Sequence, residues 1–336
     1  MVSITTVADR AKVSRMTVTR VLRGEERVAA KTRNRVLKVM KDLAYVPSPA
    51  ARAMRSKDKL VSRQATCVAV VFSPDTAVDD GFFCEIARGI EDAAAVHRLC
   101  PLQVHWQNRF EADWPRLQSV FAVGGLCGAI LIGQFGRDEV ATVLKHTLYV
   151  VVVDGPAPAD LPVASVESDN VGGCRLAIQR LVDGGCKRVQ VMTGPLEHYF
   201  SQAMMAAGRF FPPERFEMLN FYPCQYTSAA GEAMAKGVWS VEKYFDGVFG
   251  NDDQAIGVLR GLADLGIRAP EEVKVIGFDD IPHAAYTQPR LTTIGIDKRQ
   301  LGREAVAALV DLVSEKKSAT EVKAVVKARL VVRESA

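Results

Sequence analysis

Residues 3–24 read SITTVADRAKVSRMTVTRVLRG, and this stretch predicts two short helices joined by a tight turn. The second helix begins after Ser14, whose hydroxyl can accept a backbone N–H that has no partner in the first turn. Within it Val18, Val21 and Leu22 recur at helical spacing and form one apolar stripe. Two helices this short, crossing at a tight turn, are typical of a helix-turn-helix.

The opposite face of the second helix is polar and basic. In a helix-turn-helix this helix lies in the major groove of DNA, with its first residues at the base edges. Arg15 and Arg20 suit guanine, because a guanidinium can meet both of its acceptor atoms, whereas Met16 suits a thymine methyl group. Thr19 lies on the same face. A basic amphipathic hairpin that only faces solvent is the alternative interpretation.

The charge of the chain is unevenly distributed. Residues 1–63 hold 16 of the 43 Lys and Arg but only 5 of the 39 Asp and Glu, so the remainder of the chain is acidic. A basic head on an acidic body predicts a polyanionic partner for the head alone.

A third helix, from about Lys31 to Ala44, is predicted to close a three-helix core over the apolar stripe. The next stretch, YVPSPAARAMRSKDK at 45–59, holds one bulky apolar residue, Met54, between arginines. From the residues alone it is either an interdomain linker or a short basic helix that wedges Met54 into a minor groove.

From residue 64 onward, apolar strands alternate with amphipathic helices. This rhythm predicts an α/β body of two doubly wound parallel-sheet lobes, following the all-α headpiece. The clearest strand segments are TCVAVVF (66–72), GAILIG (128–133), YVVVVD (149–154), RVQVMTG (188–194) and EVKVIGF (272–278).

Several classes of protein are disfavoured. No apolar run approaches the roughly 20 residues of a membrane span, and the polar start of the chain lacks a signal-peptide core, so we expect a cytoplasmic protein without a membrane partner. The seven cysteines are scattered without CxxC spacing, which predicts core residues rather than disulfides or a metal site. No phosphate-binding loop or nucleophile motif occurs, so we expect neither catalysis nor a cofactor.

Long ordered blocks of the sequence resemble the lactose-repressor family of transcription regulators. The blocks are TTVADRAKVSRMTVTRVLRG (5–24), VAAKTRNRVLKVMKDLAYVP (28–47), DGVFGNDDQAIGVLRGLADLGIRAPEEVKVIGFDD (246–280), QPRLTTI (288–294) and LGREAVAAL (301–309). The resemblance implies a repressor that binds palindromic operator DNA as a homodimer and is controlled by a small effector. It divides the chain into a headpiece (1–47), a hinge helix and linker (48–63) and an effector-binding and dimerisation domain (64–336). QPRLTTI and the Arg15-Met16 pair resemble gluconate-type repressors, which implies a sugar or sugar acid as effector.

The resemblance also implies roles for single residues of the headpiece and linker. Arg15, Met16 and Arg20 match positions that contact bases, and Met54 matches the residue that is inserted into the minor groove. The remaining matches are Ser14, Thr17 and Thr32 near phosphates, and Tyr45, which closes the headpiece.

For the body, the resemblance implies a fold similar to periplasmic sugar-binding proteins, with the effector between the lobes at the carboxyl ends of the strands. We expect an N-lobe of about 64–158 and 291–320, a C-lobe of about 160–289 and 322–336, and crossovers near 155–162, 288–292 and 318–322. A two-lobed solute-binding protein is the alternative function.

Candidate effector-binding residues come from strand ends and from the resemblance. Aromatic faces can stack on a sugar ring, and carboxylates can accept its hydroxyl protons. Asp252 matches the family's ligand-binding aspartate. The family usually has an arginine where this chain has Met205, three residues before Gly208, and Arg209 is a possible replacement. The other candidates are Asp75, Phe82, Phe83, Asp154, Phe200 and Phe278.

Overall fold

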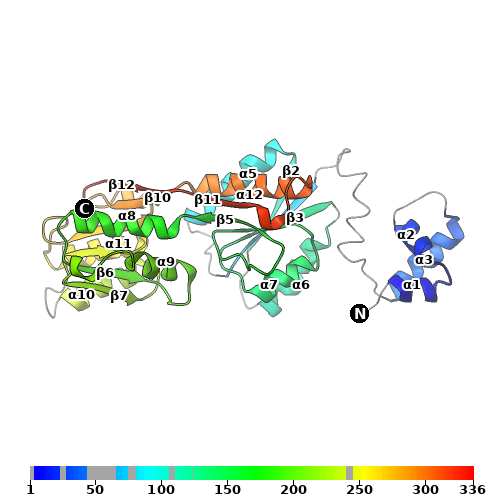
Figure 1. Ribbon diagram of the computed structural model, residues 1–336, viewed down its shortest axis with the longest axis horizontal. Coiled ribbons are helices and arrows are strands. Elements are labelled where there is room, and N and C mark those ends of the chain that lie inside the picture. The colour runs from blue at the N-terminus through cyan, green and yellow to red at the C-terminus, as the bar shows by residue number, and fades with distance from the viewer. Residues whose placement is uncertain are drawn as a thin grey trace.

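The computed structural model describes residues 4–22, 28–43, 66–74, 81–105, 110–123, 125–239 and 245–336. It contains a group of three helices and two six-stranded sheets, each sheet with helices on both faces (Figure 1). The predicted hinge (48–63), Tyr45, Met54 and Asp75 lie outside the described residues. No helix in the described ranges is both long enough and apolar enough to cross a bilayer.

The headpiece consists of α1 (Ile4–Arg10), α2 (Arg15–Leu22) and α3 (Ala30–Asp42). The Ser14 hydroxyl accepts the Thr17 N–H at 3.1 Å, as expected for the residue that begins α2. The turn before it places Lys12 in the left-handed region, at φ 52°. The helices bury a small common core of Val7, Ala8, Ala11, Val18, Val21, Val28 and Val36.

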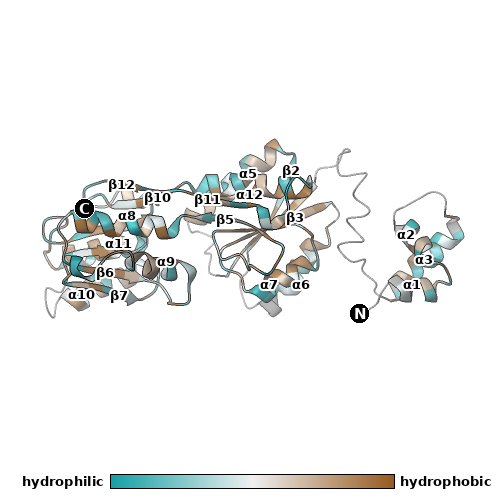
Figure 2. Ribbon diagram, viewed as in Figure 1, coloured by the Kyte–Doolittle hydropathy of each residue, from teal (hydrophilic) through white to brown (hydrophobic). Residues whose placement is uncertain are grey.

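The N-lobe is built on a wholly parallel sheet in the order β11-β5-β4-β3-β1-β2. Helices α5 and α12 cover one face and helices α6 and α7 the other. The central strands β1, β3 and β4 are buried on both faces, which explains their nearly continuous apolar sequences (Figure 2). The elements are β1 (Thr66–Phe72), α5 (Gly81–Val96), β2 (Leu99–His105), α6 (Phe110–Phe121), β3 (Leu126–Ile132), α7 (Arg137–Leu144), β4 (Val150–Val153), β5 (Ala164–Ser168), α12 (Lys298–Val313) and β11 (Lys323–Val326).

The C-lobe sheet has the order β12-β10-β9-β8-β6-β7, in which only β12 is antiparallel to its neighbour. Helices α8 and α9 cover one face, and α10 and α11 cover the other. The elements are α8 (Asn170–Asp183), β6 (Arg188–Thr193), α9 (Tyr199–Gly208), β7 (Met218–Pro223), α10 (Ser228–Trp239), β8 (Gly247–Phe249), α11 (Asp252–Asp264), β9 (Lys274–Asp279), β10 (Thr292–Ile296) and β12 (Ala328–Val331). Short 3-10 helices lie at Pro213–Arg215, Pro282–Ala285 and Ala319–Glu321.

The three crossovers between the lobes were predicted at the wrong positions. β5 and β11 belong to the N-lobe sheet and β10 to the C-lobe sheet, so the chain crosses at Asp169, at Asp297 and at Lys327. The expected crossovers near 155–162, 288–292 and 318–322 lie just before β5, β10 and β11. The chain instead crosses just after each of these strands. A buried strand has the same apolar pattern in either sheet, and therefore the sequence could not assign VASVES (163–168) to its lobe.

Helices α5 and α12 touch backbone to backbone in the N-lobe. A Cβ atom added to Gly302 would lie 2.2 Å from the Ile86 carbonyl oxygen, and one added to Gly89 would lie 2.2 Å from the Arg299 carbonyl oxygen. The Arg299 side chain then pairs with Glu85 at 2.6 Å. Glycine at these two positions is thus required by the close approach of the helices.

Gly302→Ala is expected to lower the free energy of unfolding by about 1–3 kcal/mol, because the added methyl group meets backbone atoms that cannot turn aside. Urea unfolding of the full chain measures the effect. Gly237→Ala in α10 is the matched control, since no atom lies within 4 Å of its added Cβ. The control should gain up to about 1 kcal/mol from reduced freedom of the unfolded chain. Equal stability of the two variants would contradict the packing argument.

Candidate functional site

A cavity of about 240 Å³ lies between the two lobes. Its walls come from the ends of strands and the starts of helices in both sheets, which is where α/β proteins bind ligands. The volume falls just below the usual range of small-molecule sites and so fits a small ligand. The lining residues are Ser73, Phe82, Phe83, Gly133, Gln134 and Asp154 of the N-lobe, and Asn170, His198, Tyr199, Phe200, Tyr226, Asn251, Asp253 and Asp279 of the C-lobe.

Four of the predicted effector residues line this cavity: Phe82, Phe83, Asp154 and Phe200. Two others, Asp252 and Phe278, do not. Phe278 is 1% exposed and packs in the core, with ring centroids 4.7 Å from Phe200 and 6.4 Å from Phe249.

Asp154 connects the two lobes at the cavity. It follows β4 with φ 49°, a backbone conformation that is costly for a residue other than glycine and often marks functional sites. Its carboxylate accepts hydrogen bonds from the Ser168 hydroxyl at 2.7 Å and from the Tyr199 hydroxyl of the C-lobe at 2.9 Å. Burial raises the pKa of Asp154, and the two hydroxyl donors oppose that rise. A second contact between the lobes joins the Tyr199 N–H to the Gln134 side-chain oxygen at 3.3 Å.

Lys298 does not line the cavity but supports the turn that carries Asp279, which does. This lysine is only 9% exposed, and its ammonium group donates to the backbone carbonyls of Asp279 and Asp280. Both aspartates have positive φ, 110° and 53°. Lys298 also lies 5.7 Å from the centroid of the Phe82 ring. The lysine therefore stabilises the strained turn that brings Asp279 to the cavity.

Aromatic side chains form much of the remaining wall. Phe82 and Phe83 meet edge to face at 5.2 Å, and Phe200 lies 6.0 Å from Tyr226. The Tyr226 hydroxyl is 2.7 Å from that of Ser201, and burial raises the pKa of Tyr226 to about 12, so this phenol stays protonated. Ring faces beside carboxylates suit a ligand with apolar faces and hydroxyl groups.

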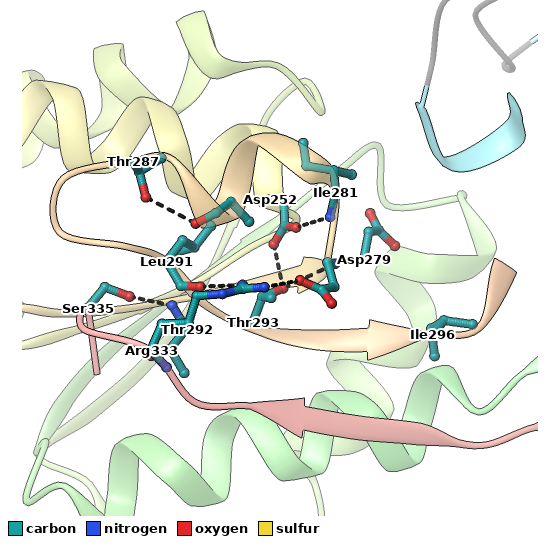
Figure 3. Close-up of polar contacts among 12 residues, drawn as sticks. Asp252, Asp279, Ile281, Thr287, Leu291, Thr292, Thr293, Ile296, Arg333 and Ser335 are labelled. Atoms are coloured by element: carbon teal, nitrogen blue, oxygen red, sulfur yellow. Dashed lines mark hydrogen bonds and ion pairs between the residues drawn. The ribbon is translucent and has the colours of Figure 1, made fainter. Parts of the chain in front are cut away.

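Asp252, for which the resemblance implies ligand binding, is not among the residues that line the cavity. It is 1% exposed at the start of α11. Its carboxylate accepts the Ile281 N–H at 2.8 Å and the Thr293 hydroxyl at 2.5 Å (Figure 3). The two neighbours of Asp252, Asn251 and Asp253, line the cavity instead.

The strand-end rule that selected Asp154 also identifies several residues that we did not predict. Gln134 and Asp279 each come directly after an apolar strand segment named above, and Asn251 lies two residues after the end of β8. Asn170, at the first crossover, could have been found only with the correct lobe boundaries. His198, Tyr199 and Tyr226 carry no comparable sequence signal.

Neither Met205 nor Arg209 reaches the cavity. Both line a separate groove on the C-lobe together with Phe216 and Phe221. None of the described residues that line the interlobe cavity is Arg or Lys, and three of them are aspartates. Arg209 therefore does not replace the arginine that the family usually carries. Within the described residues, no group of three His, Cys, Asp or Glu side chains could hold a metal ion.

The headpiece presents the predicted polar face of α2. Arg15, Met16 and Arg20 are exposed, with Met16 at 61%, and the Arg15 guanidinium lies 3.3 Å from the Thr5 hydroxyl. The hydroxyls of Ser14 and Thr17 are 2.9 Å apart. Thr19 donates its hydroxyl to the Arg15 carbonyl at 3.0 Å, and Thr32 is half-buried at the start of α3.

Replacing Asp252 by Asn should flatten the dependence of stability on pH. Burial raises the pKa of Asp252 from 3.8 to about 7, so the folded chain keeps a proton that the unfolded chain has already lost. The free energy of unfolding therefore falls as pH rises from about 4 to about 7, by at most about 1.4 kcal/mol per pH unit from this group. Urea unfolding across this range should show a shallower slope in Asp252→Asn.

Asp160→Asn is the control. Arg137 lowers the pKa of the Asp160 carboxyl, so this group makes the free energy of unfolding rise with pH instead of falling. An Asp252→Asn profile parallel to that of the parent would show that Asp252 is ionised in the folded chain throughout this range.

Comparison with known proteins agrees with this architecture. Residues 3–48 match the model of bacterial regulatory proteins of the lacI family, and residues 178–336 match a periplasmic binding protein-like domain. The transcriptional regulator CelR of Thermobifida fusca is 30% identical, over 98% of this chain and 96% of its own. The transcriptional repressor CytR of Escherichia coli K12 is 30% identical, over 91% of this chain and 88% of its own.

Solved structures share the architecture of this chain. A complex of the regulator CelR with cellobiose is 26% identical, with a TM-score of 0.72 and full coverage of both chains. A lac repressor dimer bound to operator is 22% identical, with a TM-score of 0.71, over 99% of this chain and 98% of its own. These relatives are regulators rather than enzymes, and this chain belongs with them to the lacI family of bacterial regulatory proteins.

Proposed function

We propose that this regulator represses transcription by binding a two-fold symmetric operator as a homodimer, and that a small polyhydroxylated ligand in the interlobe cavity controls the binding. The observation that carries the proposal is the presence, in one chain, of a helix-turn-helix with an exposed basic face and of a cavity shared by two lobes. The lac repressor dimer bound to operator supports the DNA-binding half. We place the protein in the cytoplasm, with the chromosome.

In this proposal α2 enters the major groove. Arg15 and Arg20 donate to guanine acceptors, and Met16 contacts an apolar base edge. Because the Thr19 hydroxyl already donates within its own helix, only its oxygen lone pairs remain for a base. Ser14, Thr17 and Thr32 approach phosphates. The roles of Tyr45 and Met54 rest on the resemblance alone.

The cavity supplies the control. Tyr199 bridges the lobes through Asp154 and Gln134, so a ligand that competes for these two N-lobe groups changes the balance between open and closed lobes. The change in DNA affinity cannot exceed the difference between the ligand's affinities for the two states. A solute-binding protein would share the two lobes, but the headpiece favours the regulator.

The charges of the cavity favour a neutral or cationic ligand over a sugar acid. Asp154, Asp253 and Asp279 would repel a ligand carboxylate, and the described lining offers no Arg or Lys to offset them. The implied gluconate-like effector therefore suits this site poorly. The cellobiose bound by CelR and the ribose bound by an Enterococcus faecium regulator are neutral sugars and support the proposed class.

Arg20→Ala should weaken binding to a selected operator by roughly 5- to 150-fold and weaken binding to random duplex much less, since a bidentate base contact is worth about 1–3 kcal/mol. Fluorescence anisotropy with both duplexes measures the ratio, after operator selection from random sequences. Arg20→Lys is the matched control, because it keeps the charge but loses the planar fork. Equal losses on both duplexes in Arg20→Ala would mean that Arg20 contacts only phosphate.

Neutral sugars, but not their acids, should bind the cavity. Calorimetric titration with pairs such as glucose and gluconate tests this, and Asp253→Asn should weaken a responsive sugar about tenfold by removing a charged acceptor. Glu214→Gln, which removes the same charge from an exposed site outside the cavity, is the control. An acid that binds more tightly than its neutral parent would refute the proposed ligand class and leave the DNA-binding proposal intact.

A further inference from the structure

Two cysteines stand directly opposite each other in the N-lobe sheet. Cys67 is the second residue of β1 and Cys100 is the second residue of β2, and the two are partners in the parallel register. Neighbouring strands lie about 4.7–4.9 Å apart, which is within the Cα separation of roughly 4.4–6.8 Å that a disulfide accepts. Directly paired residues also project from the same face of a sheet, so the two thiols meet.

The surroundings of the pair differ from those of the other cysteines. β2 is an edge strand, and Cys100 is the one exposed cysteine of the seven, all of which lie in the described ranges. Cys67 is half-buried, and its pKa is raised first by burial and then by the adjacent Cys100 thiol, with which it hydrogen-bonds. Cys127 on β3 is 7% exposed, and burial raises its pKa to about 11. An oxidant in solvent therefore reaches Cys100 first and finds a second thiol beside it.

We propose that Cys67 and Cys100 form an oxidation site, which closes to a reversible intrachain disulfide when the protein meets a peroxide. The Cys100 thiolate attacks one oxygen of the peroxide and breaks the O–O bond, which gives a sulfenic acid and releases hydroxide. The Cys67 sulfur then displaces hydroxide from the sulfenic sulfur. With the two thiol protons, the products are one disulfide and two waters: the thiols lose two electrons and hydrogen peroxide gains them.

The geometry favours a reversible bond. Cys100 is exposed on the edge strand β2, so a reductant in solvent can reach a bond formed there. Exposed disulfides are typically among the labile and regulatory ones.

The site is also separate from the effector cavity. Cys67 and Cys100 lie at the amino ends of their strands, whereas Ser73, just past the carboxyl end of β1, lines the cavity. In the sequence Cys67 comes two residues after the segment 44–65, which connects the headpiece to β1. The proposal therefore does not depend on the identity of the effector.

The test treats reduced full-length protein with a small excess of hydrogen peroxide, blocks the free thiols and maps the peptides by mass spectrometry without reduction. We expect a Cys67–Cys100 cross-linked peptide as the main product, a fall from seven to five titratable thiols in the unfolded chain, and full recovery with dithiothreitol. Cys67→Ser and Cys100→Ser should each abolish the cross-link, whereas Cys127→Ser should retain it.

Two results would overturn the proposal. One is oxidation of Cys100 to sulfinic acid in the parent protein with Cys67 still reduced. The other is a cross-link between different cysteines, or between two chains. Circular dichroism of each variant before treatment separates a missing cross-link from a failure to fold.

Discussion

The two lobes depend on three chain crossings that are fixed by short polar contacts. At the first, Asp169 accepts the Gly172 N–H at 3.1 Å and so begins α8, and at the second Asp297 accepts the Gln300 N–H at 2.8 Å and begins α12. At the third, the Lys327 ammonium lies 3.2 Å from the Asp169 carboxylate, which ties two crossings together. One face of each sheet has a buried apolar cluster confined to its own lobe, so we expect a change in the angle between the lobes to be absorbed at these crossings and at the polar contacts of the cavity.

The sequence was sufficient for those features that depend on local pattern. Amphipathic periodicity and the cap at Ser14 predicted the three-helix headpiece, and the alternation of strands and helices predicted two wound sheets. The lobe boundaries failed because membership of a sheet depends on pairing between distant strands, such as β11 with β5, which leaves no local signal. Residue-level placement at the start of α11 was also beyond the sequence: a step of one residue there turns a side chain by about 100°, so Asp253 lines the cavity while the Asp252 carboxylate accepts the Thr293 hydroxyl.

The cavity gathers features that work against stability. Asp154 and Asp279 both have positive φ, and Asp154 places a carboxyl group in a position that is only 4% exposed. Such strain persists only where the surrounding structure enforces it. Here the enforcing groups are Lys298, which holds the carbonyls of Asp279 and Asp280, and Asp252, which holds the Ile281 N–H and the Thr293 hydroxyl. No arginine among the described lining residues neutralises the cavity carboxylates, so we expect a bound ligand to offset the cost of keeping them there.

Strand β1 runs from the end of the N-lobe nearest the headpiece in sequence to the end that lines the cavity. It begins after the segment that leads from the headpiece and ends at the effector cavity, roughly 20 Å away at 3.3 Å per residue. It is paired on both sides and almost wholly buried, so it cannot stretch or slip without breaking the sheet. We therefore expect a ligand in the cavity to change the angle between the lobes rather than the N-lobe sheet itself, and the crossings at Asp169, Asp297 and Lys327 are the places where the chain can absorb such a change.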